Sequence, residues 1–127
     1  MRQRVTEVTI ANAASLSGAA ILDGDIVAIV MPSAWTAANL TFQGATIVQT
    51  TGATPGGVTV GTYQDIYDSG GTELAVTAAA SRYIVLTPAL AAALRGFGAI
   101  KIRSGTSGTP VNQGAARTIS IVTWQYK

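Results

Sequence analysis

The chain has 127 residues, carries a formal net charge of +2, and contains neither cysteine nor histidine. The lack of cysteine excludes disulfides, thiolate metal sites and a cysteine nucleophile, and the lack of histidine removes the commonest general base and metal ligand. The length predicts one domain, and so small a net charge argues against a nucleic-acid partner.

The share of charged side chains is unusually low. Only 11% of the residues are Asp, Glu, Lys or Arg, whereas about 25% is usual in soluble domains. A weakly charged surface favours aggregation of a free monomer and suits a protein that stays docked on other subunits. We therefore expect a homo-oligomer or an assembly-bound protein that is not an enzyme and needs no cofactor or metal.

Residues 1–14 are expected to form an N-terminal arm or first strand. Within residues 5–11 polar and apolar side chains alternate, which places Val8 and Ile10 on one face and Glu7 on the other. This strand is therefore expected to be half exposed.

Two further strands are expected before the middle of the chain. Residues 26–31 are a continuous apolar run that indicates a buried strand, and Pro32 ends it because proline cannot donate to the ladder. The run is far shorter than the about 20 residues that span a bilayer, so we expect no membrane segment. Residues 39–45 are the next strand candidate, and residues 33–38 are a loop or a turn of helix.

The middle of the chain predicts a hairpin. Residues 50–61 are rich in Thr, Gly and Pro and indicate a long loop with a short strand at 58–60. Residues 62–67 and 73–77 are then two strands joined by the turn 68–71, where glycine supplies the positive φ of a tight turn.

A strand and a helix are expected after the hairpin. Residues 82–87 are a strand candidate in which successive side chains face opposite ways. A short helix is expected over residues 87–96, because Thr87 is a favourable cap, Pro88 suits the first turn and Gly96 marks the end.

The C-terminal part adds two strands. In residues 99–104 the isoleucines alternate with Lys101 and Arg103, so both cations are expected to point outward together. Residues 105–114 are expected to form a loop, and residues 117–124 the closing strand.

Taken together, these elements predict an all-β fold. Many short antiparallel strands with one brief helix favour a β-sandwich, with the jelly roll as a form that fits, in a single domain over residues 15–127. Strand order does not follow from these patterns.

Three groups of residues could carry chemistry, and each also has a structural explanation. Asp23 and Asp25 could begin a calcium loop, but the remainder of the loop pattern is missing and a turn explains them. Asp65 and Asp68 could pair as acid and base, although Asp68 lies where a hairpin turn prefers aspartate. Residues 104–108 resemble a glycine-rich anion loop without its Gly-Lys-Ser/Thr ending, which favours a flexible connection.

Basic and aromatic side chains are the candidates for partner contacts. Lys101, Arg103 and Arg117 form a basic stripe if their strands are neighbours, and otherwise belong to a solvated strand face. Trp35 and Trp124 are candidate interface anchors, since aromatic residues in strands are usually core or interface residues. A sugar-binding platform is the alternative for the aromatic residues, which also include Tyr63, Tyr67, Tyr83 and Tyr126.

Several stretches of the sequence resemble a known class of protein. Residues 17–36 with 40–43, and residues 100–106 with 111–113, resemble small structural proteins of tailed bacteriophages, namely head decoration (cementing) proteins with sandwich folds. The resemblance extends over most of the chain, but it lies in the general character of the sequence and in short stretches of residues. It provides no diagnostic set of site residues.

The resemblance implies a symmetric oligomer on the capsid exterior, bound to the major capsid protein or another virion protein and made in the cytoplasm of a bacterial host. Such a protein stabilises the assembled lattice by binding it. Arg2 and Arg4 are candidates for reaching a neighbouring subunit, because extended segments add strands to exposed edges. The alternatives are a carbohydrate-binding module for host glycans and a tail or neck component. Neither a nucleic acid nor a membrane is expected as a partner.

Overall fold

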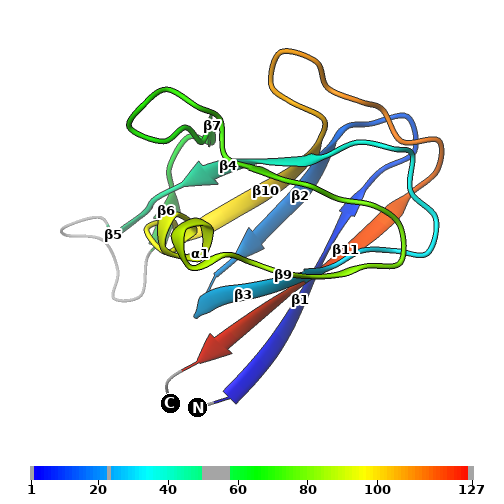
Figure 1. Cartoon of the computed structure of the whole chain (residues 1–127). Helices are drawn as coiled ribbons and strands as arrows, with labels where there is room; N and C mark the ends of the chain where they lie inside the picture. Colours follow the sequence, from blue (N-terminus) through cyan, green and yellow to red (C-terminus); the bar gives the residue numbers. More distant parts are fainter. Residues whose placement is uncertain (1, 23, 50–57, 126–127) are drawn as a thin grey trace.

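The computed structural model describes residues 2–22, 24–49 and 58–125, which form strands and one short helix (Figure 1). In chain order the elements are β1 (Arg2–Ile10), β2 (Leu16–Ile21), β3 (Asp25–Val30), β4 (Leu40–Ala45), β5 (Ile47–Gln49), β6 (Val58–Val60), β7 (Gln64–Asp65), β8 (Ala75–Val76), β9 (Tyr83–Val85), α1 (Pro88–Leu94), β10 (Ala99–Ser104) and β11 (Arg117–Gln125). The expectation of an antiparallel all-β fold with one short helix is confirmed. Within the described ranges, no helix is long and apolar enough to cross a membrane.

Most strands belong to one antiparallel sheet. Its nine strands follow the order β7-β4-β10-β2-β1-β11-β3-β9, and β8 pairs with β4 beside β7. β7 pairs with Gln43 and Gly44 of β4, and β8 with Leu40 and Thr41, so together they act as one interrupted edge strand. β5 and β6 form a separate two-stranded ribbon. The large sheet therefore has β7 and β8 at one edge and β9 at the other.

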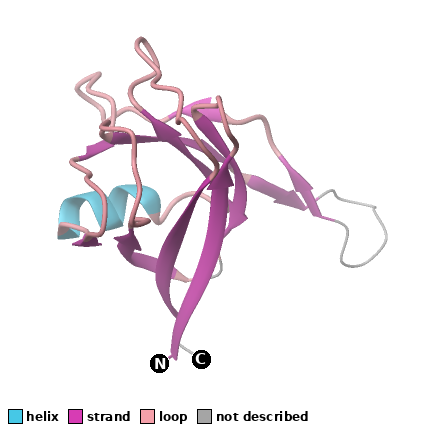
Figure 2. Ribbon diagram, turned by 90° about the vertical axis from the view of Figure 1, so that its right-hand side faces the viewer, coloured by secondary structure: helices cyan, strands magenta, loops and turns pink. Residues whose placement is uncertain are grey.

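The sheet curls where β1 meets β2. Among the described residues, these two strands are paired only at Ile10 and Ser17. The two halves of the sheet splay from that point and face one another as a half-barrel (Figure 1, Figure 2). Side chains from both halves meet in one buried core, including Val8, Ile10, Ile29, Ile119 and Ile121 from one half and Leu40, Phe42, Ile100 and Ile102 from the other. Burial of this shared apolar surface holds the two halves together.

The first strand has the alternation that its sequence predicts. Val8 and Ile10 are buried, whereas Val5 and Glu7 are exposed. β1 pairs with β11 along its whole length, beginning at Arg2. The N-terminal segment is thus built into the sheet as its first strand.

The predicted helix is confirmed as α1. The side chain of Thr87 accepts a hydrogen bond from the backbone N–H of the third residue after it, at 3.3 Å. Leu94 is fully buried and joins the core. At the C-terminal end of the helix, Arg95 Nε lies 3.2 Å from Asp25 Oδ1. Capping and packing therefore hold this short helix against the sheet.

Two features differ from the expectations. The sequence patterns do not indicate β2 or β5, and β2 consists largely of small residues with little preference for strands. The hairpin is formed at its turn, where Tyr67 and Glu73 make a bridge, but beyond the turn both strands pair with β4. Pairing with strands that are distant in the sequence therefore determines that β2 forms and that the two hairpin strands pair with β4.

Candidate functional site

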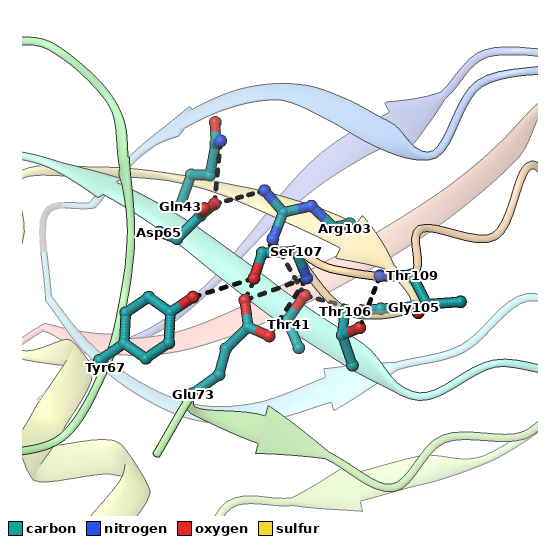
Figure 3. Close-up of polar contacts among 10 residues, drawn as sticks. All are labelled: Thr41, Gln43, Asp65, Tyr67, Glu73, Arg103, Gly105, Thr106, Ser107 and Thr109. Atoms are coloured by element: carbon teal, nitrogen blue, oxygen red, sulfur yellow. Dashed lines mark hydrogen bonds and ion pairs between the residues drawn. The ribbon is translucent and has the colours of Figure 1, made fainter. Parts of the chain in front are cut away.

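A buried arginine organises a polar cluster on the face of β4 and β10 that points away from the core (Figure 3). Arg103 lies opposite Thr41 in the ladder and is only 7% exposed. Its Nη2 atom forms an ion pair with Asp65 Oδ1. Its Nη1 atom lies 3.3 Å from Glu73 Oε2 and 3.4 Å from Thr41 Oγ1. One guanidinium thus bridges two carboxylates of the segment 64–73, which covers these strands.

Further hydrogen bonds tie the neighbouring segments to this cluster. Gln43 Nε2 donates to Asp65 Oδ1 at 3.1 Å. The backbone N–H of Ser107 donates to Glu73, at 3.2 Å from Oε1 and 3.3 Å from Oε2. The hydroxyls of Tyr67 and Ser107 are 2.9 Å apart (Figure 3). The cluster therefore joins β4, β10, the segment 64–73 and the loop after β10.

The electrostatics of the cluster follow from the position of Arg103. Its guanidinium, mainly through the hydrogen bond, holds the pKa of Asp65 below the usual value, while burial acts in the opposite direction and Gln43 contributes to the lowering. Two carboxyl groups that act as a general acid and a general base need environments that give them different pKa values. Here both carboxylates are engaged by the same cation, so the arrangement functions as a clamp on the edge of the sheet.

The other aspartates singled out in the sequence have separate roles. Asp68 Oδ1 accepts hydrogen bonds from two backbone N–H groups of its own turn, both at 2.9 Å, as turn chemistry predicts. Asp25 forms an ion pair with Arg95, and Asp23 lies outside the described residues. In the described part of the chain, no group of three or more His, Cys, Asp or Glu side chains could hold a metal ion.

The loop 104–108 closes on itself after β10, and its interpretation as a flexible connection stays a prediction. Gly105 has a φ of +89°, which favours glycine, and it forms a bridge with Pro110. The N–H of Ser107 does bind an anion, and that anion is the protein's own Glu73. The loop thus completes the clamp around Arg103.

The three cations considered as a basic stripe are not brought together. β2 and β1 lie between β10 and β11 in the sheet, so Arg117 is separated from Lys101 and Arg103. Lys101 Nζ lies 4.4 Å from the centre of the Tyr63 ring. The expectation that Arg103 points outward to solvent is wrong, because the segment 64–73 covers its side chain and supplies its carboxylate partners.

The remaining candidate contacts lie on different parts of the surface. Arg2 Nη2 donates to Gln125 Oε1 at 3.1 Å across β1 and β11, and Arg4 is exposed on the same strand as Arg2. Trp35 is half-buried against the core, whereas Trp124 is half-buried on β11. Their role in partner binding stays a prediction.

The tyrosines are divided between the two halves of the sheet. Tyr63 and Tyr67 lie in or beside the segment that covers β4 and β10, whereas Tyr83 is on β9 at the opposite edge. Tyr126 lies outside the described residues. The described tyrosines therefore do not gather as one platform for a sugar ring.

Apolar side chains gather on the outer side of β1, β11, β3 and β9. The ladder places four of them in one row across these strands: Val5, Val122, Ala28 and Val85. Residues directly opposite in adjacent strands share a face, and successive residues alternate between faces. Because Ile121 points into the core, this row points outward.

Three large apolar residues in this region remain open to solvent. Val85 is 74% exposed, Tyr83 58% and Val5 53%. Tyr83 belongs to the neighbouring outward row, which also contains Glu7. We define the outer face by these two outward rows. One row contains Val5, Val122, Ala28 and Val85, and the other contains Glu7, Ser120, Val30 and Tyr83. Val122 and Ala28, in the middle of the first row, are each only 2% exposed. Only Glu7 among the members of the two rows is charged, so the face is largely uncharged.

The sequence contains a signal for the outer face that strand periodicity alone does not reveal. Residues 83–86 are apolar at every position, so β9 is apolar on both sides. Ile84 and Leu86 turn toward the core, which leaves Tyr83 and Val85 on the outside. An apolar run on an edge strand can therefore indicate an exposed binding face.

Comparison of the chain with protein-family models, curated proteins and solved structures gives no match. The outer face and the cluster around Arg103 are thus the features from which a function can be inferred. The cluster is satisfied within the chain, whereas the outer face is open to a partner.

Proposed function

We propose that this protein is a virion structural protein, specifically a capsid decoration or cementing protein that binds the assembled major capsid protein lattice. The observation behind the proposal is the outer face, which carries little charge and on which Val5 of β1 and Tyr83 and Val85 of β9 are exposed. Exposed apolar area on one face of a small domain commonly marks a protein-binding surface. Covering it gains about 25 cal/mol for each Å² of apolar area removed from water.

Binding alone is sufficient for this function. A protein that binds only the assembled lattice stabilises it by about 2.7 kcal/mol per site when the free protein is at 100 times its Kd. A chain with only 11% charged residues also suits permanent docking on other subunits. The cementing role therefore needs no catalytic group.

The proposal includes a homo-oligomer on the exterior of the capsid, with no nucleic-acid or membrane partner. It also includes the description of the fold as a β-sandwich of jelly-roll type, which is supported by two sheet halves facing one another across one core. A tail or neck component would use the same outer face on a different virion protein, and imaging of the particle distinguishes the two positions.

A charge on the outer face tests the proposal. Val5→Lys should weaken binding about tenfold, because docking would bury an unpaired ammonium group. Ile21→Lys is a matched control, since Ile21 is also 53% exposed but lies on β2 in the other half of the sheet. Cosedimentation with capsids of the source bacteriophage, prepared without this protein, measures both variants.

Two results would reject the proposal. If the unmodified protein does not cosediment with capsids, the decoration role is wrong. If Val5→Lys binds as tightly as Ile21→Lys, the outer face is not the docking surface.

A further inference from the structure

The curled sheet leaves a cleft between its two edges. β8 and β9 line opposite walls of this cleft, which has a volume of about 600 Å³. α1 forms a third wall through Ala89, Leu90 and Ala93. The apolar side chains that line the cleft from the two edges include Leu74, Val76, Ile84 and Leu86. The cleft is thus an apolar groove with a strand on either side.

The β9 wall presents backbone groups that the sheet does not use. The N–H of Leu86 and the C=O of Arg82 bond toward β3, at 3.0 and 2.8 Å. In an antiparallel ladder, the residues between such positions point their N–H and C=O groups the opposite way. The backbone groups of Tyr83 and Val85 therefore point away from β3, toward the open edge.

The β8 wall is a shorter edge. The N–H of Ile66 donates to the C=O of Phe42 at 3.1 Å, which sets the alternation along this side of β4. By the same alternation, the backbone groups of Ala75 point away from β4. β8 pairs with β4 over two residues, whereas β9 pairs with β3 over three. β9 is therefore the better template for an added strand.

One end of the cleft is acidic. Asp68 and Glu73 line it, and Asp65 shares Arg103 with Glu73. Arg103 offsets one of these negative charges, and the carboxylate of Asp68 adds to the other, so this end is negatively charged. Residues 77–82 connect β8 to β9, so the acidic residues, which precede β8, lie at the far end of the cleft from this connection. That end is beside the C-terminal end of β9.

We propose that the cleft binds an extended peptide segment of a partner protein as a strand antiparallel to β9. A peptide backbone offers the row of N–H and C=O groups that an open sheet edge can bond, and its alternate apolar side chains fill the groove. Antiparallel pairing places the N-terminus of the peptide at the acidic end. A basic side chain near that N-terminus therefore complements Asp68 and Glu73.

A synthetic peptide tests this proposal directly. The probe is the acetylated, amidated and dye-labelled peptide Lys-Val-Ser-Val-Ser-Val, and fluorescence anisotropy measures its binding to the full chain. Binding is expected to be saturable, to weaken with added salt, and to slow the hydrogen exchange of the amides of Tyr83 and Val85. Replacing lysine by glutamate in the peptide should weaken binding about fivefold.

Variants of the protein separate the backbone contribution from the charge. Val85→Pro removes one N–H from the open edge, a position where proline is tolerated, and should weaken binding about fivefold. Ala75→Pro makes the same change on the facing edge and should leave binding unchanged. Asp68→Asn keeps the acceptor oxygen of the turn and should reduce the preference for the lysine peptide.

Several outcomes would overturn the proposal. The proposal is wrong if the lysine peptide shows no saturable binding. It is also wrong if Val85→Pro binds the peptide as tightly as the unmodified protein, or if only Ala75→Pro loses binding. N-methylation of the peptide at alternate residues tests the same hydrogen bonds with the unmodified protein, should Val85→Pro fail to fold. Val5→Lys should bind the peptide normally, so a failure of the cleft and a failure of the outer face are distinguishable.

Discussion

Replacing Arg103 with methionine is expected to destabilise the fold by about 3 kcal/mol. The change leaves two carboxylates without the cation that they share: that of Glu73, whose side chain is 14% exposed, and that of Asp65, whose side chain is 32% exposed. Removing one partner of a buried ion pair costs about 3–5 kcal/mol. Because water partly screens the carboxylate of Asp65, the lower end of that range applies.

Urea denaturation near neutral pH measures this loss. With a slope of about 2 kcal/mol per molar urea, the midpoint should fall by about 1.5 M. Arg82→Met is the control, since the Arg82 side chain is exposed and its loss should change the unfolding free energy by less than about 0.5 kcal/mol. Adding Asp65→Asn and Glu73→Gln to Arg103→Met should restore part of the lost unfolding free energy, because these changes remove the unpaired charges. An unfolding free energy equal to that of the unmodified protein would refute the clamp.

The same ion pair predicts a dependence of stability on pH. Arg103 lowers the pKa of Asp65 in the folded protein, so the folded state binds a proton at this site less readily than the unfolded state. The resulting stability is complete above the unfolded pKa of about 3.9 and is lost as the pH falls through the lower folded value. Between about pH 5 and about pH 2, the unmodified protein should therefore lose more stability than Arg103→Met. Parallel pH profiles for the two proteins would contradict this cause.

Three further substitutions test the packing and capping of the fold. Gly24→Ala directs a Cβ against the backbone oxygen of Trp124 and should cost about 1–3 kcal/mol, whereas Gly18→Ala meets open space and should leave the Tm nearly unchanged. Thr87→Ala removes the cap of α1 and should cost about 1 kcal/mol in thermal unfolding, with serine at this position restoring it. Phe42→Ala empties a fully buried position and should cost about 3–5 kcal/mol in urea, and a loss below about 1 kcal/mol would show that this site repacks.

Local patterns were sufficient to predict several elements. The cap at Thr87 and the turn at Asp68 depend on hydrogen bonds within a few residues, and both are formed as expected. The alternation of Val8 and Ile10 with Glu7 likewise predicts the two faces of β1. These features were accessible because the interactions that define them lie within one segment.

Other features depend on partners far away in the chain. β2 has few strand-favouring residues and forms because β10 supplies a paired strand. The alternation in β10 correctly separates Arg103 from the core, but it carries no information about whether another segment covers the opposite face. Here the segment 64–73 covers it and converts an expected surface cation into the buried centre of a cluster.

The amino-acid order alone establishes a weakly charged, all-β chain without cysteine or histidine, together with the period of its strands and the position of its helix. The curl at β1 and β2, the neighbours of each strand, the exposure of Val5 and Val85 on one face and the cleft between β8 and β9 arise only in the folded chain. Periodicity sets how adjacent side chains are oriented within one strand. Exposure and edge position instead depend on which distant strands pair and which surfaces they cover.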